Sequence, residues 1–182
     1  MTADPRVTFA ELATWPDDGR QYELYDGEVI VNPAPMPRHQ LVCLRLTEVH
    51  VEYRSAHGGL LLFSPIDIVF SEHNVVQPDI VYFREERRGS IDMMEAIRIP
   101  PDLAVEVLSR ATEVRDRGRK MQLFARFGVP EYWIGDPVKN TLELNRPVEG
   151  HYVCVATWGE QAVARSATLA ELTFAVTRIF EA

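Results

Sequence analysis

The feature that most restricts the fold is segment 103–108, in which five apolar residues surround one glutamate, Glu106. In an extended strand, successive side chains point to opposite faces of the sheet, so Glu106 shares its face with Ala104 and Leu108. The other face is entirely apolar. A strand that is apolar on both faces is typical of a sheet covered on both sides. We therefore expect this segment to lie within a sheet that has helices on its faces.

The remaining segments predict the elements around this strand. Thr8 and Glu11 fit a capping box, which begins a short helix, and Asp26-Gly27 between two apolar runs is typical of a β-hairpin. We predict strands at 22–25, 28–31, 60–63, 66–70, 80–83, 131–134, 142–145 and 152–156, a polar loop at 84–95, and further helices at 38–57, 112–127 and 169–180. This order indicates a mixed α/β fold, with a central mixed β-sheet flanked by helices and an N-terminal β-hairpin. The length favours one domain over residues 1–182.

The N-terminal sequence has neither a basic start nor a continuous apolar stretch, which argues against a secretory signal. No apolar run approaches the ~18–20 residues of a membrane span. We therefore expect a cytoplasmic protein without a membrane segment. Cys43 and Cys154 lie far apart in the sequence, and we find no close Cys/His pairs of a structural zinc site. We interpret both cysteines as small core residues without a disulfide.

The net charge of −8 argues mildly against non-specific binding of nucleic acid, although a local basic surface would suffice for DNA. Segment 110–126 offers such a surface, because six basic residues stand there against Glu113 and Asp116. A solvated helix face is the simpler interpretation of a charge run taken alone.

Three charged residues stand where the periodicity predicts core, and Glu106 is the first. A buried carboxylate needs a cation, because an unpaired buried charge is strongly destabilising. A structural salt bridge with an arginine would also satisfy it. Lys120 is the second, since at 100° per residue it shares a narrow arc of its helix with Glu113 and Phe124. Its ammonium could still reach water along the side chain.

Asp79 is the third misplaced charge. It follows Pro78 at the start of a predicted strand, next to an interruption in strand pairing, and shares an extended face with Gln77. Taken alone, Asp79 would be interpreted as a turn or capping aspartate.

Together these residues supply two carboxylates and one ammonium on one sheet. Two carboxylates at close range repel each other unless a cation separates them, and Mg²⁺ or Mn²⁺ prefers carboxylate oxygens. Such an ion can activate water and stabilise charge on a phosphate, while a nearby lysine orients the water or neutralises that charge. The sequence therefore predicts phosphodiester hydrolysis, with Asp79 and Glu106 as metal ligands and Lys120 beside them.

Several blocks spread over nearly the whole chain carry a resemblance to a known family. They are 22–28 (YELYDGE), 37–39 (PRH), 77–79 (QPD), 101–109 (PDLAVEVLS), 115–120 (RDRGRK) and 128–137 (GVPEYWIGDP). In this order they resemble the Uma-two family of putative restriction endonucleases, within the PD-(D/E)XK nuclease superfamily. The resemblance implies a restriction-endonuclease-like fold with a four-stranded mixed core sheet, and it implies Asp79 and Glu106 as metal ligands. The superfamily lysine usually lies two residues after the second acid, where this chain has Leu108, so the resemblance implies that Lys120 replaces it.

Glu23, His39 and Gln77 lie in the same blocks and are additional candidates for the site. The alternative for Glu23 is a surface charge of the hairpin, and for His39 a helix-start histidine satisfied by the backbone. Arg115 and Arg119 should point further round the helix than Lys120, toward solvent. They are candidates for contacts with DNA phosphates.

We therefore expect a Mg²⁺- or Mn²⁺-dependent endonuclease that acts on DNA. Two alternatives stay open: a catalytically silent nucleic-acid-binding or regulatory module of the same fold, and a metal-dependent hydrolase of a small phosphorylated substrate. Cutting both strands of a duplex needs two active sites or one that acts twice, so a homodimer is expected. The hairpin 22–31 and the strands at 142–156 offer apolar surface for it.

Overall fold

The apolar run forms β7 (Leu103–Val107), which lies inside a six-stranded sheet, as its pattern predicts. The structure is a computed structural model that describes residues 6–181. The first five residues, on which the expectation of no secretory signal partly rests, lie outside the described part of the chain. No helix within residues 6–181 is both long and apolar enough to cross a membrane.

The larger sheet consists of two antiparallel groups that are joined by one parallel pair, β7 with β8. Its order is β10 (His151–Gly159), β9 (Thr141–Val148), β8 (Tyr132–Asp136), β7, β6 (Ile80–Phe83) and β3 (Leu60–Phe63). The mixed sheet is therefore confirmed. The strands β3, β6, β7 and β8 form a mixed four-stranded core, and the hairpin of β9 and β10 pairs with β8 and extends the sheet to six strands.

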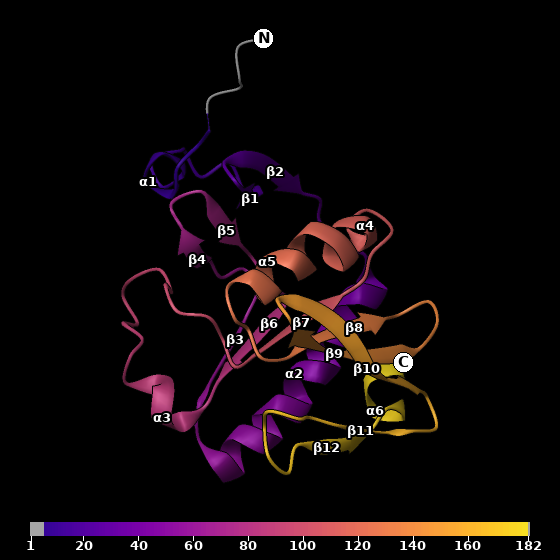
Figure 1. Ribbon diagram of the computed structural model, residues 1–182. Coiled ribbons are helices and arrows are strands. Elements are labelled where there is room, and N and C mark those ends of the chain that lie inside the picture. Colours follow the sequence, from indigo (N-terminus) through magenta and orange to yellow (C-terminus); the bar gives the residue numbers. More distant parts are fainter. Residues whose placement is uncertain (1–5, 182) are drawn as a thin grey trace.

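A smaller antiparallel sheet stands above the larger one in Figure 1 and contains the predicted N-terminal hairpin. Its order is β2 (Glu28–Asn32), β1 (Gln21–Tyr25), β5 (Asn74–Val76) and β4 (Ile68–Ser71). The turn between β1 and β2 needs two residues that tolerate positive φ, and Asp26 and Gly27 adopt φ of 50° and 86°. A side chain at position 27 would also place its Cβ 2.6 Å from the Cβ of Arg6. This turn therefore requires glycine at position 27, and the predicted Asp-Gly pair meets both conditions.

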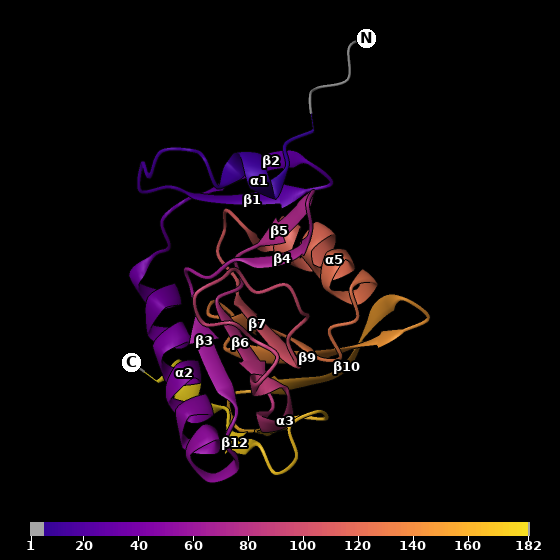
Figure 2. The same ribbon diagram turned by 90° about the vertical axis from the view of Figure 1, so that its left-hand side faces the viewer.

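Helices cover both faces of the larger sheet (Figures 1 and 2). The long helix α2 (Pro37–His57) covers one face and ends at Gly58, as expected. A continuous helical segment covers the other face and consists of α4 (Glu113–Arg115), the π-helix η1 (Asp116–Lys120) and α5 (Met121–Arg126). The remaining helices are short: α1 (Phe9–Leu12), α3 (Glu85–Arg88) and α6 (Thr177–Phe180).

The burial of β7 follows the predicted alternation. Leu103, Val105 and Val107 belong to the core cluster that packs against α2. Ala104 and Leu108 belong to the cluster that includes side chains of α5. Glu106 shares this second face and is only 4% exposed. The sequence pattern therefore places a carboxylate inside the core, as expected.

The C-terminal segment differs from the prediction of a helix at 169–180. It forms β12 (Thr173–Ala175), paired with β11 (Val163–Arg165), and only then the short α6. Along 171–176, exposed and buried residues alternate strictly, which is the period of a strand and not of a helix. The predicted polar loop 84–95 also contains a helix, α3. The prediction of a strand at 66–70 missed that β4 continues into a second strand, β5.

The two cysteines lie in different environments. Cys43 is half-buried on α2, whereas Cys154 is exposed on β10. The prediction that both belong to the core is therefore wrong for Cys154. The physical reason is that β10 is an edge strand of the sheet, and its side chains are mostly exposed on both faces.

Candidate active site

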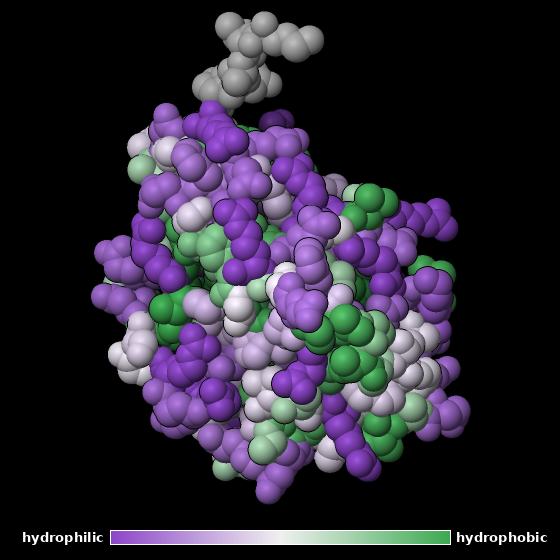
Figure 3. All heavy atoms as spheres, in the orientation of Figure 1, coloured by the Kyte–Doolittle hydropathy of each residue, from purple (hydrophilic) through white to green (hydrophobic). Residues whose placement is uncertain are grey.

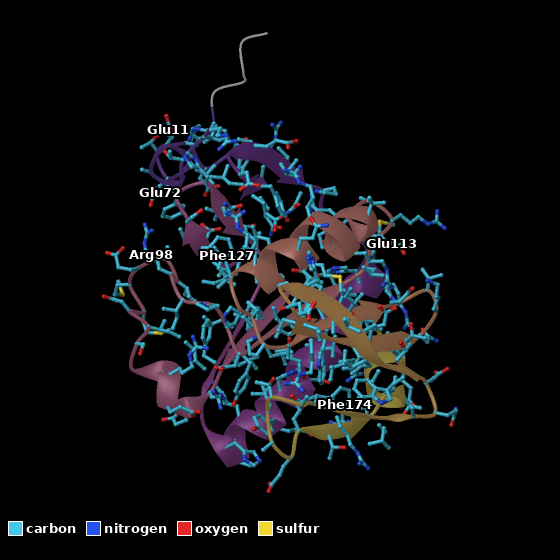
Figure 4. The ribbon with its side chains drawn as sticks, in the orientation of Figure 1. Glu11, Glu72, Arg98, Glu113, Phe127 and Phe174 are labelled. Atoms are coloured by element: carbon cyan, nitrogen blue, oxygen red, sulfur yellow. The ribbon has the colours of Figure 1, made fainter. Side chains whose placement is uncertain are left out.

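The helical segment that carries Lys120 contains a π turn, in which the backbone bonds run to the fifth residue instead of the fourth. The wider turn changes the direction of the side chains that precede it. Asp116 and Lys120 both face the sheet and are buried. Glu113, which regular helix geometry places beside Lys120, is instead exposed and points outward from α4 (Figure 4). This expectation for Glu113 is therefore wrong, because the helix is not regular.

Lys120 occupies the centre of a buried ionic cluster and is 2% exposed. Its Nζ atom lies 2.7 Å from Glu106 Oε1 and 2.9 Å from Glu23 Oε1. It also donates a hydrogen bond of 3.2 Å to the carbonyl oxygen of Gln77. The ammonium therefore does not reach water along its side chain. The partner of Glu106 is this lysine, and not the arginine that a structural salt bridge was expected to use.

Glu23 reaches the same cluster from β1 of the smaller sheet and is fully buried. Its carboxylate accepts hydrogen bonds from the backbone N–H of Gln77 at 2.7 Å and from the Tyr25 hydroxyl at 3.1 Å. Burial favours a higher pKa for Glu23, but the Lys120 ammonium, the Gln77 N–H and Arg115 together lower the pKa below its usual value. The interpretation of Glu23 as a surface charge of the hairpin is therefore wrong.

Glu106 is paired with Lys120 but has no aligned hydrogen-bond donor at its buried oxygen, Oε1, among the described residues. Burial raises the pKa of Glu106 well above its usual value, and the charges of Asp79, Asp116 and Glu23 raise it further. Burial lowers the pKa of Lys120, but Glu106 and Glu23 outweigh this effect and hold the ammonium protonated.

Asp79 follows Pro78 immediately before β6, and its side chain is 16% exposed. Its Oδ2 atom accepts a hydrogen bond of 2.8 Å from the backbone N–H of Val107, the residue after Glu106. The same oxygen lies 3.2 Å from Nε2 of His39, at the start of α2. Asp79 therefore bridges two elements of the fold, which is more than a turn or capping aspartate does.

His39 contacts side chains of two other residues, Asp79 and Cys43, in addition to the backbone of Val107, so it is more than a helix-start histidine satisfied by the backbone. Its Nδ1 atom lies 3.5 Å from Sγ of Cys43, one helical turn later. Burial lowers the pKa of His39, but the hydrogen bond and the charge of Asp79 raise it above its usual value. Burial also raises the pKa of the Cys43 thiol, and the carboxylates of Asp79 and Glu106 add to this effect.

One cavity of about 270 Å³ connects these groups. Its lining includes Asp79, Glu106, Lys120, His39, Gln77, Arg115 and Asp116. Glu23 lies behind Lys120 and joins the cluster through the ion pair. The structure thus brings together all three predicted core residues and the three additional candidates.

The two arginines predicted to face solvent behave differently. Arg115 turns inward, lines the cavity and lies 3.6 Å from Glu23 Oε2 through its Nε atom. The expectation that it points to solvent is therefore wrong, and the π turn that follows it is the reason. Arg119 is exposed, forms an ion pair of 2.8 Å with Glu28 and lies over the ring of Tyr25.

Asp116 is the member of the site that the sequence analysis missed. It is almost fully buried, and its Oδ1 atom has no hydrogen-bond partner among the described residues. Burial raises the pKa of this carboxyl, while Lys120 lowers it. Its position four residues before Lys120 was the available signal, because residues i and i+4 share a helix face.

The charges of the site leave an excess of carboxylates. Asp79, Glu106, Glu23 and Asp116 converge there, against the cations Lys120 and Arg115. Like charges at this density raise each other's free energy unless a further cation is present. Carboxylate oxygens are the ligands that Mg²⁺ and Mn²⁺ prefer, so the set fits a hard divalent cation.

Comparison with known proteins identifies a family and a solved structure of the same fold. A family model described as a putative restriction endonuclease, Uma2, matches residues 9–177. An uncharacterized protein from Synechocystis sp. is 27% identical over 124 residues, which are 66% of this chain and 63% of that protein. This chain thus spans less than two thirds of that relative's length. The crystal structure of a putative nuclease of the DUF820 group from Anabaena variabilis superposes with a TM-score of 0.77 over 96% of this chain and 97% of that one, at 20% identity.

Proposed function

The chain belongs to the Uma2 family of putative restriction endonucleases, and on this basis we propose that it is a metal-dependent endonuclease that hydrolyses DNA phosphodiester bonds in the cytoplasm. The observation that carries the proposal is the convergence of Asp79, Glu106 and Lys120 on one cavity. Family membership supports the nuclease class, and the excess of carboxylates supports the need for a cation.

In this proposal Asp79 and Glu106 hold one Mg²⁺ or Mn²⁺ ion. Both carboxylates line the same cavity, and Glu106 has only the Lys120 ammonium as an ion-pair partner, at its Oε1 atom. When bound, the ion promotes ionisation of the attacking water and stabilises the charge that develops on the phosphate. Its positive charge would also favour the ionised form of Glu106, whose pKa is raised by burial and by the neighbouring carboxylates.

The chain's own residues orient these groups. The N–H of Val107 and the imidazole of His39 fix the carboxylate of Asp79. Glu23 and the carbonyl of Gln77 hold the ammonium of Lys120 against Glu106. A lysine held in this way can orient the attacking water or neutralise charge on the phosphate, and such prearranged groups need no reorganisation during the reaction.

The proposal includes DNA contacts and a two-fold dimer. The exposed Arg119 is the stronger candidate for a phosphate contact, because Arg115 is already engaged by Glu23. Two copies would supply one active site for each DNA strand. Exposed valines, Val153 and Val155, lie on the edge strand β10, and Figure 3 shows hydrophobic side chains gathered over this part of the surface. This edge supports the proposed dimer contact.

The decisive experiment is nicking of a supercoiled plasmid with Mg²⁺ or Mn²⁺ by the wild type, by Asp79→Asn and by the control Asp92→Asn. Asp92 is exposed, lies in a loop and caps a backbone N–H that asparagine can also cap. We expect the wild type and the control to cut and Asp79→Asn to be inactive. Equal cutting by all three would contradict the proposed site.

Two further outcomes separate the alternatives. Duplex binding by the wild type without cutting under any metal would favour a silent binding module. Hydrolysis of a small phosphate ester with little dependence on salt would favour the small-substrate hydrolase, because only DNA binding releases many counterions.

A further inference from the structure

The first two turns of α2 and the start of β6 bring together three different metal-ligating side chains. His39 and Cys43 are one helical turn apart and face the same direction. Asp79 approaches them from the other element, and one ligand atom from each of the three residues lies within 4.8 Å of the other two. This cluster borders the proposed Mg²⁺ site but contains a sulfur and a nitrogen, which Mg²⁺ does not favour.

We propose that His39, Cys43 and Asp79 form a second cation site, for a thiophilic ion of the Zn²⁺ class. Thiolate, imidazole and carboxylate are the ligands that zinc uses in proteins. Three protein ligands and one open position are typical of a reactive zinc site, and here the open position faces the cavity that His39 and Asp79 line.

One ligand atom from each of the three residues lies within 4.8 Å of the others, which is wider than a bound zinc ion needs. Tetrahedral zinc places neighbouring nitrogen, oxygen and sulfur ligands roughly 3.3–3.6 Å apart. Asp79 Oδ2 lies 3.2 Å from His39 Nε2, and Cys43 Sγ lies 3.5 Å from His39 Nδ1. One ion uses only one imidazole nitrogen, so the three side chains must move closer together when the ion binds. The thiol proton of Cys43 passes to solvent as the zinc–sulfur bond forms.

The second site shares Asp79 with the proposed Mg²⁺ site, and this part of the inference rests on the proposed function. When Asp79 ligates zinc together with Cys43, its carboxylate no longer binds the Mg²⁺ ion beside Glu106. Zinc therefore competes with Mg²⁺ and inhibits cleavage. Cys43 has no role in the proposed reaction, so its substitution separates the two sites.

The test of the site itself uses Co²⁺ as a spectroscopic substitute for Zn²⁺. A cobalt–thiolate bond gives an intense near-ultraviolet charge-transfer band that oxygen and nitrogen ligands do not give. We expect this band in the wild type at one equivalent of Co²⁺, its loss on addition of Zn²⁺, and its absence in Cys43→Ser. Cys154→Ser is the matched control, because Cys154 is exposed on β10 and lies outside the cluster. It should keep the band.

A band that survives in Cys43→Ser, or the absence of a band in the wild type, would overturn the site. The same Co²⁺ titration of Cys43→Ala, together with its melting temperature, shows whether loss of the band in the serine variant results from a folding defect. This arm needs no cleavage, so its result is independent of the proposed nuclease function.

The regulatory part is tested by titrating Zn²⁺ into the Mg²⁺-dependent plasmid assay. Loss of one of three ligands should weaken inhibition by at least about tenfold in Cys43→Ser, while cleavage with Mg²⁺ alone stays at the wild-type rate. Cys154→Ser should be inhibited like the wild type. Equal zinc sensitivity of the two variants would contradict the competition through Asp79.

Discussion

Glu131 and Glu106 are both buried glutamates beside neighbouring strands of the same sheet, but their surroundings differ. Every oxygen of Glu131 accepts a hydrogen bond from an N–H group: Trp133 Nε1 at 2.6 Å, Ala167 N at 2.8 Å and Thr168 N at 2.7 Å. Glu106 has Lys120 beside it as an ion-pair partner. Among residues 6–181, however, no donor has the alignment for a hydrogen bond to its Oε1 atom.

The difference indicates two uses of a buried carboxylate. Glu131 fastens the C-terminal segment, which includes Phe174 (Figure 4), to the sheet through neutral donors. Its requirement for partners is fully met. Glu106 is left with repelling carboxylates around it, and a bound cation would meet its requirement. We interpret a buried carboxylate with hydrogen bonds to both oxygens as structural. A buried carboxylate that lines a cavity and lacks such donors is a candidate metal ligand.

The largest expected effect is on cleavage by Glu106→Gln. If Glu106 holds the metal, its loss should reduce the cleavage rate by at least about a thousandfold, which corresponds to roughly 4 kcal/mol. The same variant should lose the rise in melting temperature that Mg²⁺ or Mn²⁺ gives the wild type, because the ion stabilises only the state that binds it. Calorimetry with and without metal measures this rise. Glu160→Gln, on an exposed turn, is the control.

If metal raises the melting temperature of Glu106→Gln as much as that of the wild type, Glu106 has a structural role like that of Glu131 and serves only as the ion-pair partner of Lys120.

The next effect is on stability, through Glu131→Ala. The buried indole N–H of Trp133 and the part-buried N–H of Ala167 lose their acceptor, whereas the N–H of Thr168 keeps Ser166 Oγ at 3.1 Å. The free energy of unfolding should therefore fall by about 2–3 kcal/mol in total. The rise in melting temperature on adding metal should persist. Urea unfolding of this variant beside Glu160→Ala gives the difference. A loss of the metal response without a loss of stability would reverse the roles that we assign to the two glutamates.

A third prediction concerns the pH dependence of stability. His50 packs against Trp133, the residue whose indole N–H bonds to Glu131. Burial lowers the pKa of His50 to about 4 from its ordinary value near 6.5. The folded state therefore keeps this histidine neutral, and its contribution is complete above about pH 6.5 and is lost as pH falls toward 4. We expect this one group to remove about 2 kcal/mol of stability between pH 7 and pH 5.

Unfolding curves across this pH range measure the effect. His50→Leu should flatten the dependence on pH, whereas His151→Gln, on the exposed end of β10, should keep it. An equally steep loss of stability in His50→Leu would assign the acid sensitivity to the carboxylate cluster instead.

The smallest expected effect is on DNA binding by Arg119, an exposed residue near the Glu106 cluster. If Arg119 contacts a phosphate, Arg119→Ala should weaken duplex binding and reduce the salt dependence of the binding constant by roughly one unit of slope. Arg178→Ala is the control, because Arg178 is also exposed and ion-paired, but lies on α6. Equal slopes for both variants and the wild type would remove Arg119 from the proposed DNA surface.

Several parts of the site followed from local sequence patterns. Alternation alone put Glu106 inside a strand that is buried on both faces, and helix periodicity put Lys120 on the buried face. These patterns succeed because neighbours along one strand or helix have fixed relative directions. The family resemblance added Glu23 and His39, and it supported Gln77, which alternation had already placed on the same face as Asp79.

Other parts failed for identifiable reasons. Glu113 and Arg115 were misplaced because a π turn breaks the 100° step on which a helical projection depends. Cys154 was interpreted as core because the general tendency of cysteine to be buried does not account for its place on the edge strand β10. The tail was predicted as a helix although its residues alternate, since short apolar segments do not distinguish the two structures well.

The sequence by itself therefore determined which segments are buried, which turns need Asp-Gly or Gly, and which charges conflict with their surroundings. Only the tertiary structure decided which of these charges meet. The ion pair of Lys120 with Glu23 joins the helical segment to β1 of the other sheet, and the contact of His39 with Asp79 joins α2 to the start of β6. Such contacts depend on how whole elements pack against each other. The side-chain periods of 2 residues in strands and 3.6 in helices show which face of an element is buried, but not which element covers it.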